Sequence, residues 1–145
     1  MKVEGKQLFP APVERVWNMF IDPVFLYRAM PGCEKMVETE PGKFDIRIDV
    51  GIAAVRGKYD GKMEIVSPQV HERYLLKGEG KGKPGFVKGE ALIVFSEKDG
   101  ATEVTYSGDM QIGGLIAGVG QRVMSGVTKM ILGDFFKNME KELKG

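Results

Sequence analysis

The last part of the chain decides the fold: residues 113–144 read GGLIAGVGQRVMSGVTKMILGDFFKNMEKELK. The apolar residues of this stretch recur at spacings of three and four, which is the period of one face of an α-helix. At about 1.5 Å per residue, such a helix is a rod about 45 Å long, longer than a small domain is wide. We therefore expect the preceding residues to build a layer across which this helix lies. The apolar face consists of Ile116, Val119, Val123, Val127, Met130, Ile131, Phe135, Met139 and Leu143.

The first half of this predicted helix is rich in glycine, and each glycine costs a helix about 1 kcal/mol relative to alanine. We interpret the glycines as positions where side-chain bulk is left out so that a bound molecule fits against the helix. A bulky residue at Gly126 is then expected to block binding. A close contact between helix and sheet, or a frayed first turn, is an open alternative. The glycines are Gly113, Gly114, Gly118, Gly120, Gly126 and Gly133.

The composition is that of an ordinary globular protein. A chain of 145 residues is normally one domain, and 43% hydrophobic residues supply a real core, so we expect a single domain over residues 1–145. The formal net charge of +1 gives no electrostatic reason to expect a nucleic-acid partner. The sequence shows no apolar signal-peptide core and no run of about 18 apolar residues. With a single cysteine as well, we expect a cytoplasmic protein that at most touches a membrane surface.

The N-terminal part of the chain predicts a strand followed by two short helices. Residues 2–9 alternate between two sides, which is the pattern of a half-buried strand. Prolines then end the strand and open a helix, and Asp22 followed by Pro23 gives the start signal of a second helix that ends at Pro31-Gly32. The apolar faces are Val13, Val16, Trp17 and Phe20 in the first helix and Leu26, Tyr27 and Met30 in the second.

From Cys33 onward the apolar period changes to two, which predicts strands. Turn sequences such as Lys98-Asp99-Gly100 join neighbouring strands, so we expect one antiparallel sheet of six or seven strands. With the helices, this order predicts an α+β fold in which two short helices and one long C-terminal helix pack across a curved sheet. The later strands are expected at residues 33–39, 43–50, 59–65, 71–82, 85–96 and 102–112.

The hairpin of residues 74–95 has one face that is nearly bare of side chains. If its loop is centred on Lys83-Pro84, residues whose numbers sum to 167 lie opposite each other. One face then pairs Lys77 with Glu90 and Glu79 with Lys88. The other face permits a strong bend, a close backbone approach or an open cavity; we favour a cavity between sheet and helix, with close packing as the alternative. That face sets Leu76, Gly78, Gly80 and Gly82 against Ala91, Gly89, Val87 and Gly85.

The order of elements resembles the helix-grip fold of the START and Bet v 1-like (SRPBCC) superfamily. Four segments are similar to the CoxG family, the G subunits of carbon monoxide dehydrogenase: residues 10–34, residues 78–91, Gly113-Gly114 and Asp134-Phe135-Phe136. The resemblance implies a hydrophobic cavity between the sheet and the last helix. It also implies a role beside carbon monoxide dehydrogenase or a related molybdenum hydroxylase, either in recruiting the enzyme to the membrane or in handling a lipophilic electron carrier such as a quinone.

Other motifs give little support for catalysis. Residues 80–85 match G-x-G-x-x-G, but a dinucleotide site needs a helix after the motif, and here a strand follows. His71 is the only histidine and Cys33 the only cysteine, so we expect no acid–base pair and no metal site. The expectation is a protein without enzyme activity, cofactor or metal. A further hypothesis, besides the carrier and the adaptor described next, is an enzyme of the same superfamily, such as a cyclase or a hydrolase.

The main hypothesis is a non-enzymatic, lipid-binding type of carrier that holds an elongated apolar molecule, such as a quinone, a fatty acid or a lipid. Apolar burial supplies the affinity, and Tyr59, Tyr74 or Tyr106 is a candidate to hydrogen-bond a carbonyl headgroup. The expected wall is Ile48, Val50, Tyr59, Met63, Leu76 and Met110 from the sheet and Ile116, Val119, Val123 and Val127 from the helix, with Met30 and Phe86 at the mouth.

The alternative is an adaptor that recruits a molybdenum hydroxylase to the membrane without any ligand. Its contact surface would be the basic hairpin, where Lys81, Lys83 and Lys88 surround Phe86. Such a lip suits anionic lipid or an acidic partner, whereas a solvated loop explains the same residues without a function.

Overall fold

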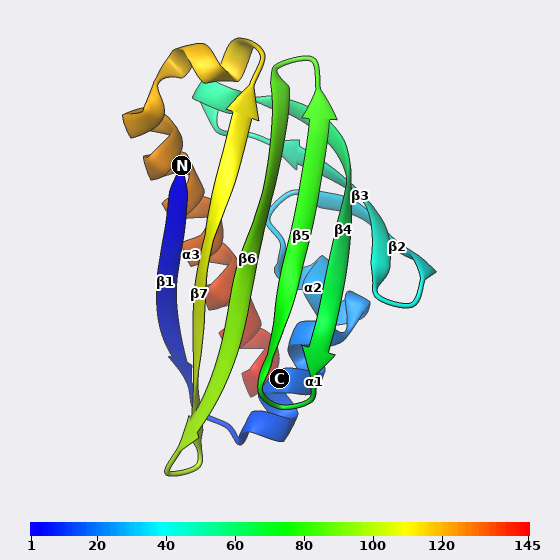
Figure 1. Ribbon diagram of the computed structural model, residues 1–145, viewed down its shortest axis with the longest axis vertical. Coiled ribbons are helices and arrows are strands. Elements are labelled where there is room, and N and C mark those ends of the chain that lie inside the picture. The colour runs from blue at the N-terminus through cyan, green and yellow to red at the C-terminus, as the bar shows by residue number, and fades with distance from the viewer.

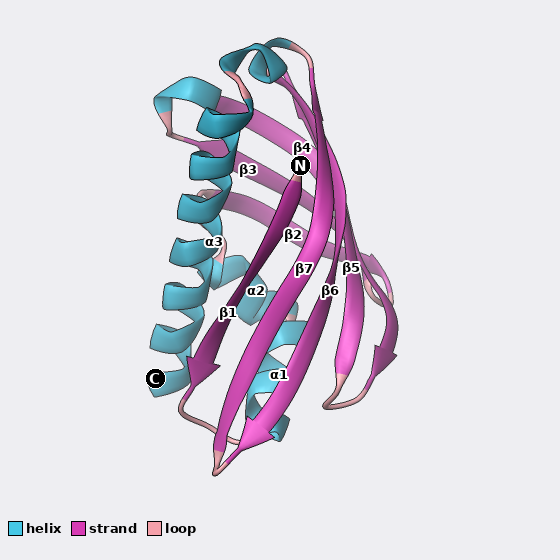
Figure 2. Ribbon diagram, turned by 60° about the vertical axis from the view of Figure 1, so that its left-hand side comes forward, coloured by secondary structure: helices cyan, strands magenta, loops and turns pink.

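The computed structural model describes residues 1–145 as a seven-stranded antiparallel sheet with three α-helices on its concave side (Figure 1). The strand order is β1-β7-β6-β5-β4-β3-β2, and α3 lies across the open side of the curved sheet (Figure 2). This arrangement confirms the predicted α+β helix-grip fold. The strands are β1 Lys2–Phe9, β2 Cys33–Glu40, β3 Lys43–Val50, β4 Gly57–Gln69, β5 Arg73–Gly82, β6 Gly85–Lys98 and β7 Ala101–Gly113. The helices are α1 Val13–Ile21, α2 Pro23–Ala29 and α3 Gln121–Lys144, with short 3-10 helices η1 Ala53–Val55 and η2 Leu115–Val119.

The two short helices form where the sequence predicts them. The Asp22 carboxylate caps α2, because its Oδ1 accepts a hydrogen bond from the Val24 amide at 2.9 Å. Pro23 occupies the first turn of α2, where its missing amide hydrogen costs nothing. Both short helices bury their apolar faces against the part of the sheet that is lower in Figure 1, and α2 also packs on α3.

Strands β5 and β6 pair in the predicted register, with Lys77 opposite Glu90 and Glu79 opposite Lys88. These side chains are exposed, and none of the ion pairs in the molecule joins them. The strand expected at residues 59–65 is longer than predicted. Strand β4 continues to Gln69 through an irregularity between Val66 and Gln69, where Ser67 has a φ of 50°.

The last helix is shorter than the sequence pattern predicts. Helix α3 begins at Gln121, while residues 113–120 form the end of β7, a turn and η2. Gly114 has a φ of 79° and Gly120 a φ of 96°, which are left-handed conformations that interrupt a right-handed helix. The 24 residues of α3 therefore make a rod about 36 Å long. The apolar spacing continues across the break, so periodicity alone does not reveal it.

The glycines inside α3 do not face the sheet. Gly126 and Gly133 are exposed, and a Cβ atom at either position would meet no atom within 4 Å. The interpretation that they leave room for a bound molecule is therefore wrong, and so is the alternative of a close helix–sheet contact. A bulky residue at Gly126 would project into solvent.

Apolar side chains between the sheet and the helices gather in two separate clusters. The lower cluster has 17 buried residues and surrounds α1, α2 and the C-terminal half of α3. The upper cluster joins η1, β4, η2 and the N-terminal half of α3. The lower cluster contains Phe9, Ala11, Val16, Trp17, Met19, Phe20, Leu26, Ala29, Phe44, Met63, Tyr74, Ile93, Phe95, Val104, Phe136, Met139 and Leu143. The upper cluster contains Val55, Tyr59, Ile116, Met124 and Val127.

Candidate functional site

On the concave face of the sheet, the position of Gly78 between the two clusters has room for a side chain. Gly78 lies on the same face of β5 as the buried Tyr74, yet a Cβ atom at Gly78 would meet only the Lys62 carbonyl oxygen, at 3.9 Å. Ile48 and Met110 point to the same side of the sheet, remain partly exposed and belong to neither cluster. We call this part of the concave face, which carries Gly78, Ile48 and Met110, the hollow.

The total surface of the molecule agrees with incomplete filling. The chain exposes 8519 Å², whereas a compact monomer of its 16.0 kDa mass exposes about 7,400 Å². Only 24 of its 145 residues are buried. The partly covered concave face is one source of the additional surface.

Part of the bareness of the concave face comes from curvature and not from an empty space. A Cβ atom at Gly82 of β5 would overlap the carbonyl oxygen of Lys58 on β4, and one at Gly89 of β6 would overlap that of Asp109 on β7, so only glycine permits these approaches of the backbones. The two explanations left open by the sequence therefore apply at different positions. Close backbone approach accounts for Gly82 and Gly89, and room for a side chain remains at Gly78.

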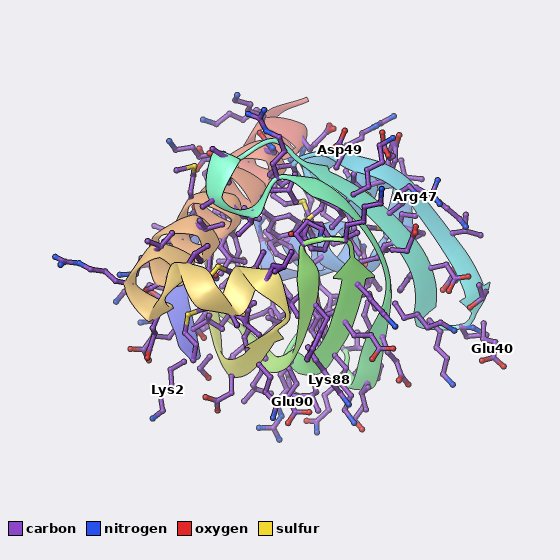
Figure 3. All side chains as sticks on the ribbon, turned by 90° about the horizontal axis from the view of Figure 1, so that it is seen from above. Lys2, Glu40, Arg47, Asp49, Lys88 and Glu90 are labelled. Atoms are coloured by element: carbon purple, nitrogen blue, oxygen red, sulfur yellow. The ribbon has the colours of Figure 1, made fainter.

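The upper cluster lies at the η2 end of the molecule, the end that faces the viewer in Figure 3. Ile116 of η2 is 3% exposed and packs in this cluster with Tyr59. The Tyr59 hydroxyl donates a hydrogen bond to the Val55 carbonyl at 2.7 Å, which ties β4 to η1, and burial raises the pKa of Tyr59. A cavity of about 310 Å³ lies against this cluster. It is lined by Ala53, Ala54, Val55, Arg56, Lys83, Pro84, Leu115 and Ile116.

Two of the three tyrosines considered as headgroup ligands already have protein partners. Tyr59 donates to a backbone carbonyl as described, and Tyr74 donates to the Phe20 carbonyl at 2.9 Å. The Tyr106 ring stacks on Phe136 with centroids 5.2 Å apart, and its hydroxyl makes no hydrogen bond within the protein. Burial raises the pKa of Tyr106, so this hydroxyl keeps its proton at neutral pH.

The structure brings five of the proposed wall residues together in and around the upper cluster and places two others at the hollow. Two more belong to the lower cluster or pack against it. The five are Val50, Tyr59, Ile116, Val119 and Val127. The residues at the hollow are Ile48 and Met110, and those of the lower cluster are Met63 and Leu76.

Three proposed site residues lie elsewhere. Val123 is 43% exposed on α3. Phe86 is 46% exposed and lies on the outer face of β6, because its neighbour Val87 faces inward and the Phe86 ring covers Gly113. Met30 caps the C-terminus of α2, whose buried residues belong to the lower cluster.

The upper cluster also contains residues that the sequence patterns had not selected as wall. Met124 and Ile131 follow the helical period of α3, and Val87 and Ile112 follow the alternation of their strands. Those four positions carried a usable signal. Val55 carried none, because the segment around η1 has no apolar period.

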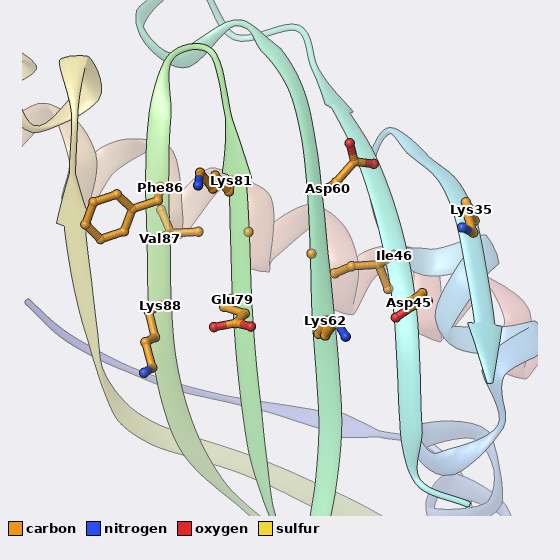
Figure 4. Close-up of a pocket in the computed structure, with 12 residues that line it drawn as sticks. Lys35, Asp45, Ile46, Asp60, Lys62, Glu79, Lys81, Phe86, Val87 and Lys88 are labelled. Carbon is orange, nitrogen blue, oxygen red and sulfur yellow. The ribbon is translucent and has the colours of Figure 1, made fainter. Parts of the chain in front are cut away.

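A larger depression, of about 530 Å³, lies on the outer face of the sheet (Figure 4). Beside it, Arg47 Nε and Asp60 Oδ1 are 2.7 Å apart, and this hydrogen bond lowers the pKa of Asp60. An open, charged surface does not suit an apolar ligand, so the hollow remains the better candidate site. The charged residues that line the depression are Lys35, Asp45, Asp60, Lys62, Glu79, Lys81 and Lys88.

The reactive side chains are dispersed over the fold. His71 has a φ of 66° in the turn after β4, and its ring lies edge-on to Trp17 with centroids 6.3 Å apart. The Cys33 thiol at the start of β2 donates to the Lys35 carbonyl, and burial raises its pKa. No three His, Cys, Asp or Glu side chains are grouped so as to hold a metal ion. No helix has the length and apolar character needed to span a bilayer.

Comparison with solved structures shows that the fold is Bet v 1-like. Ara h 8.0201 superposes with a TM-score of 0.70 at 16% identity, covering 100% of this chain and 99% of that chain. A protein from Chromobacterium violaceum gives a TM-score of 0.75 at 15% identity, covering 99% and 97%. A conserved protein from Geobacillus kaustophilus is more similar, with a TM-score of 0.97 and 34% identity over 99% of this chain and 95% of that chain.

The family follows from the sequence itself. The family model for CoxG, the G subunit of carbon monoxide dehydrogenase, matches residues 5–144, and the chain belongs to this family. The resemblance inferred from residues 10–34 and 78–91 is thereby confirmed. No curated protein matches the chain.

Proposed function

We propose that this protein is a non-enzymatic carrier that holds an elongated apolar molecule, such as a quinone, a fatty acid or another lipid, between the sheet and α3. The observation that carries the proposal is the open space at Gly78 between two separate hydrophobic clusters. An apolar ligand there would gain about 25 cal/mol for each Å² of apolar surface removed from water.

The wall of the hollow supports an apolar and adaptable site. Ile48 and Met110 border it from the sheet, and Ile131 packs against the upper cluster from α3. Methionine is flexible and polarizable, so Met110 and Met124 suit ligands of irregular shape. A long ligand would extend along α3 from one cluster toward the other.

Tyr106 supports a ligand with one carbonyl or carboxyl group. Its ring lies between Phe136 and the backbone of Gly5, and its hydroxyl has no partner in the protein. A neutral phenol donates to a carbonyl acceptor, and such a hydrogen bond contributes about 0.5–1.5 kcal/mol. Tyr106→Phe should therefore weaken binding of a quinone about two- to tenfold in a fluorescence titration. Binding of a plain hydrocarbon should stay unchanged.

The family supports a place beside a redox enzyme. Its members are described as the G subunit of carbon monoxide dehydrogenase, which is the description of an accessory protein of that enzyme. We place the protein in the cytoplasm, next to that enzyme or a related molybdenum hydroxylase, with peripheral contact to the inner face of the cell membrane. A lipophilic electron carrier held in the hollow would then pass between membrane and enzyme.

Native mass spectrometry of the purified protein, followed by organic extraction, tests the carrier directly. We expect a quinone, fatty acid or other lipid retained at nearly one molecule per chain. A protein that is empty and is not thermally stabilised by quinones or fatty acids would contradict the proposal.

A pair of matched variants locates the ligand. Gly78→Leu places a side chain in the open space and should weaken binding of a fluorescent fatty acid at least tenfold, equivalent to about 1.4 kcal/mol. Gly126→Leu is the control, because it adds the same side chain on the solvent side of α3 and should leave the affinity unchanged. Equal affinities in both variants would exclude this site.

A second function is favoured by the outer face of the sheet, where Lys81 and Lys88 are exposed beside Phe86. An adaptor could use this face to bind its partner enzyme without any ligand. Lys81→Glu combined with Lys83→Glu should then abolish capture of the purified dehydrogenase and spare ligand retention. Lys98→Glu, at the other end of β6, is the matched control.

A further inference from the structure

We propose that the apolar ligand enters and leaves the hollow at the η2 end of the molecule. In this proposal η2, Leu115–Val119, moves aside to open the entrance, and we call this segment the door. The inference rests on the proposed carrier function. It replaces the expectation that Phe86 marks the mouth, because Phe86 lies on the outer face of the sheet.

Ile116 is the buried side chain of η2. Ile116 is buried in the upper cluster, whereas the preceding Leu115 is 81% exposed. Ile116 also lines the cavity of about 310 Å³ on the outer side of the cluster, together with Val55. Withdrawing Ile116 would therefore connect that cavity with the space beneath the upper cluster.

The attachment of η2 to the rest of the fold is slight. Its one backbone hydrogen bond to another element runs from the Ile116 amide to the Pro84 carbonyl, at 2.8 Å. A second bond, from Ala117 to Gly114 at 3.1 Å, lies within the segment and moves with it. Opening η2 therefore requires breaking this hydrogen bond to Pro84 and displacing Ile116 and the partly buried Val119 from the upper cluster.

Glycines in left-handed conformations stand at both ends of η2. Gly114 and Gly120 have positive φ values of 79° and 96°. Both are exposed, and a Cβ atom at Gly120 would meet nothing within 4 Å. Rotation at these two residues would move η2 as a unit without altering β7 or α3, which is the geometry of a hinged segment.

The opposite end of the hollow offers no comparable exit. The lower cluster fills it with 17 buried residues. They include five aromatic rings from α1 and the sheet, each with its centroid within about 6 Å of at least one other. The C-terminus of α3 is fixed there by polar contacts: the Asn138 amide donates to the Ala29 carbonyl at 3.0 Å, and the Arg15 guanidinium donates to the Leu143 carbonyl.

A reversible cross-link between η2 and the turn that joins β5 and β6 tests whether η2 moves. Lys83→Cys and Leu115→Cys, both in a Cys33→Ser background, place two thiols at the same cavity, where a bifunctional methanethiosulfonate bridges them. With a fluorescent fatty acid as probe, we expect the bridge to slow uptake and release at least tenfold, to leave the equilibrium Kd within about twofold, and to be reversed by reductant. The same double variant treated with a monofunctional reagent is the control. Unchanged rates in the bridged protein would overturn the proposal.

Hydrogen exchange tests the door without any ligand. We expect the Ile116 amide to exchange at least about a hundredfold faster than the Met139 amide in α3, because opening of η2 is local. Equal protection of the two amides would overturn the door even if a ligand binds. A mobile η2 in a protein that takes up no probe would instead count against the carrier function.

Discussion

The lower and upper clusters are built from the same helix and sheet, yet they differ in size, in residue types and in the contacts that hold them together. The lower cluster has 17 buried residues and the upper cluster five. Seven of the 17 residues of the lower cluster are aromatic, whereas Tyr59 is the one aromatic residue among the five of the upper cluster. The difference indicates that the C-terminal half of α3 contributes more to the stability of the fold than its N-terminal half does.

The aromatic network explains the rigidity of the lower cluster. Phe20 contacts Phe9 and Phe95 edge-on with centroids 5.5 Å apart, and Trp17 contacts Phe95 at 5.0 Å. Edge-to-face pairs are favoured by the ring quadrupoles and contribute about 0.5–1.5 kcal/mol each beyond the burial of area. The upper cluster has no such network.

Phe136→Ala should have the largest effect on stability. Its ring contacts Phe9, Phe20 and Tyr106 from α3, so truncation leaves a cavity in the densest part of the molecule. We expect a loss of about 3–5 kcal/mol in the free energy of unfolding, measured by urea titration. A loss below about 1 kcal/mol would contradict the assignment of the lower cluster as the stabilising core.

Ile116→Ala makes the corresponding truncation in the upper cluster. We expect it to cost about 2 kcal/mol, at the lower end of the range for buried aliphatic residues, because Ile116 already borders an outer cavity. The same urea titration gives the comparison. A loss equal to that of Phe136→Ala would remove the distinction between the two clusters.

Tyr74→Phe should change the pH dependence of stability. Burial raises the pKa of Tyr74 above its ordinary value of 10.0. Below pH 10 both states keep the proton; above it the unfolded phenol ionises first, so stability falls by up to about 1.4 kcal/mol per pH unit. The variant should lose about 1 kcal/mol at pH 7, where the Phe20 carbonyl loses its donor, and should show a shallower decline between pH 10 and 12.

Tyr59→Phe is the matched variant in the upper cluster. The pKa of Tyr59 is raised by burial as well, but its hydrogen-bond acceptor, Val55, lies in the short η1 segment beside the outer cavity. Water is expected to replace the lost donor there, so the effect at neutral pH should be smaller than for Tyr74→Phe. Urea titrations of both variants at the same pH provide the test.

Gly126→Ala should have the smallest effect, and of opposite sign. Alanine fits an α-helical conformation, and the added Cβ atom meets nothing within 4 Å. We expect the midpoint of thermal unfolding to rise, with a gain of about 0.5–1 kcal/mol. A destabilised variant would show that Gly126 has a contact or backbone requirement absent from this structure.

Most of the fold could be predicted from the sequence because its signals are local. Alternation places the strands, Asp22 and Pro23 start α2, and the register of β5 and β6 follows from a short loop. The break before α3 could not be predicted from periodicity, because Ile116 in η2 keeps the helical spacing. A weighting of consecutive glycines as conformational breaks would have identified it.

The candidate site was harder to predict because it depends on which face each side chain takes in space. Phe86 and Val87 are neighbours of similar hydrophobicity, and only the strand register sends one outward and the other into the upper cluster. Val55 lies in a segment without an apolar period. A register extended from one hairpin to the whole sheet would have corrected Phe86.

The strand order also has a consequence for how the chain folds. Strands β2 to β7 each pair with a neighbour in sequence, whereas β1 pairs with β7 from Lys2↔Asp109 to Phe9↔Thr102. Closing so long a loop costs entropy, so β1 should join the sheet last although it is synthesised first. Until β7 exists, β1 has no partner strand. Its alternating charges, Lys2, Glu4 and Lys6, would keep this waiting strand from pairing with other chains.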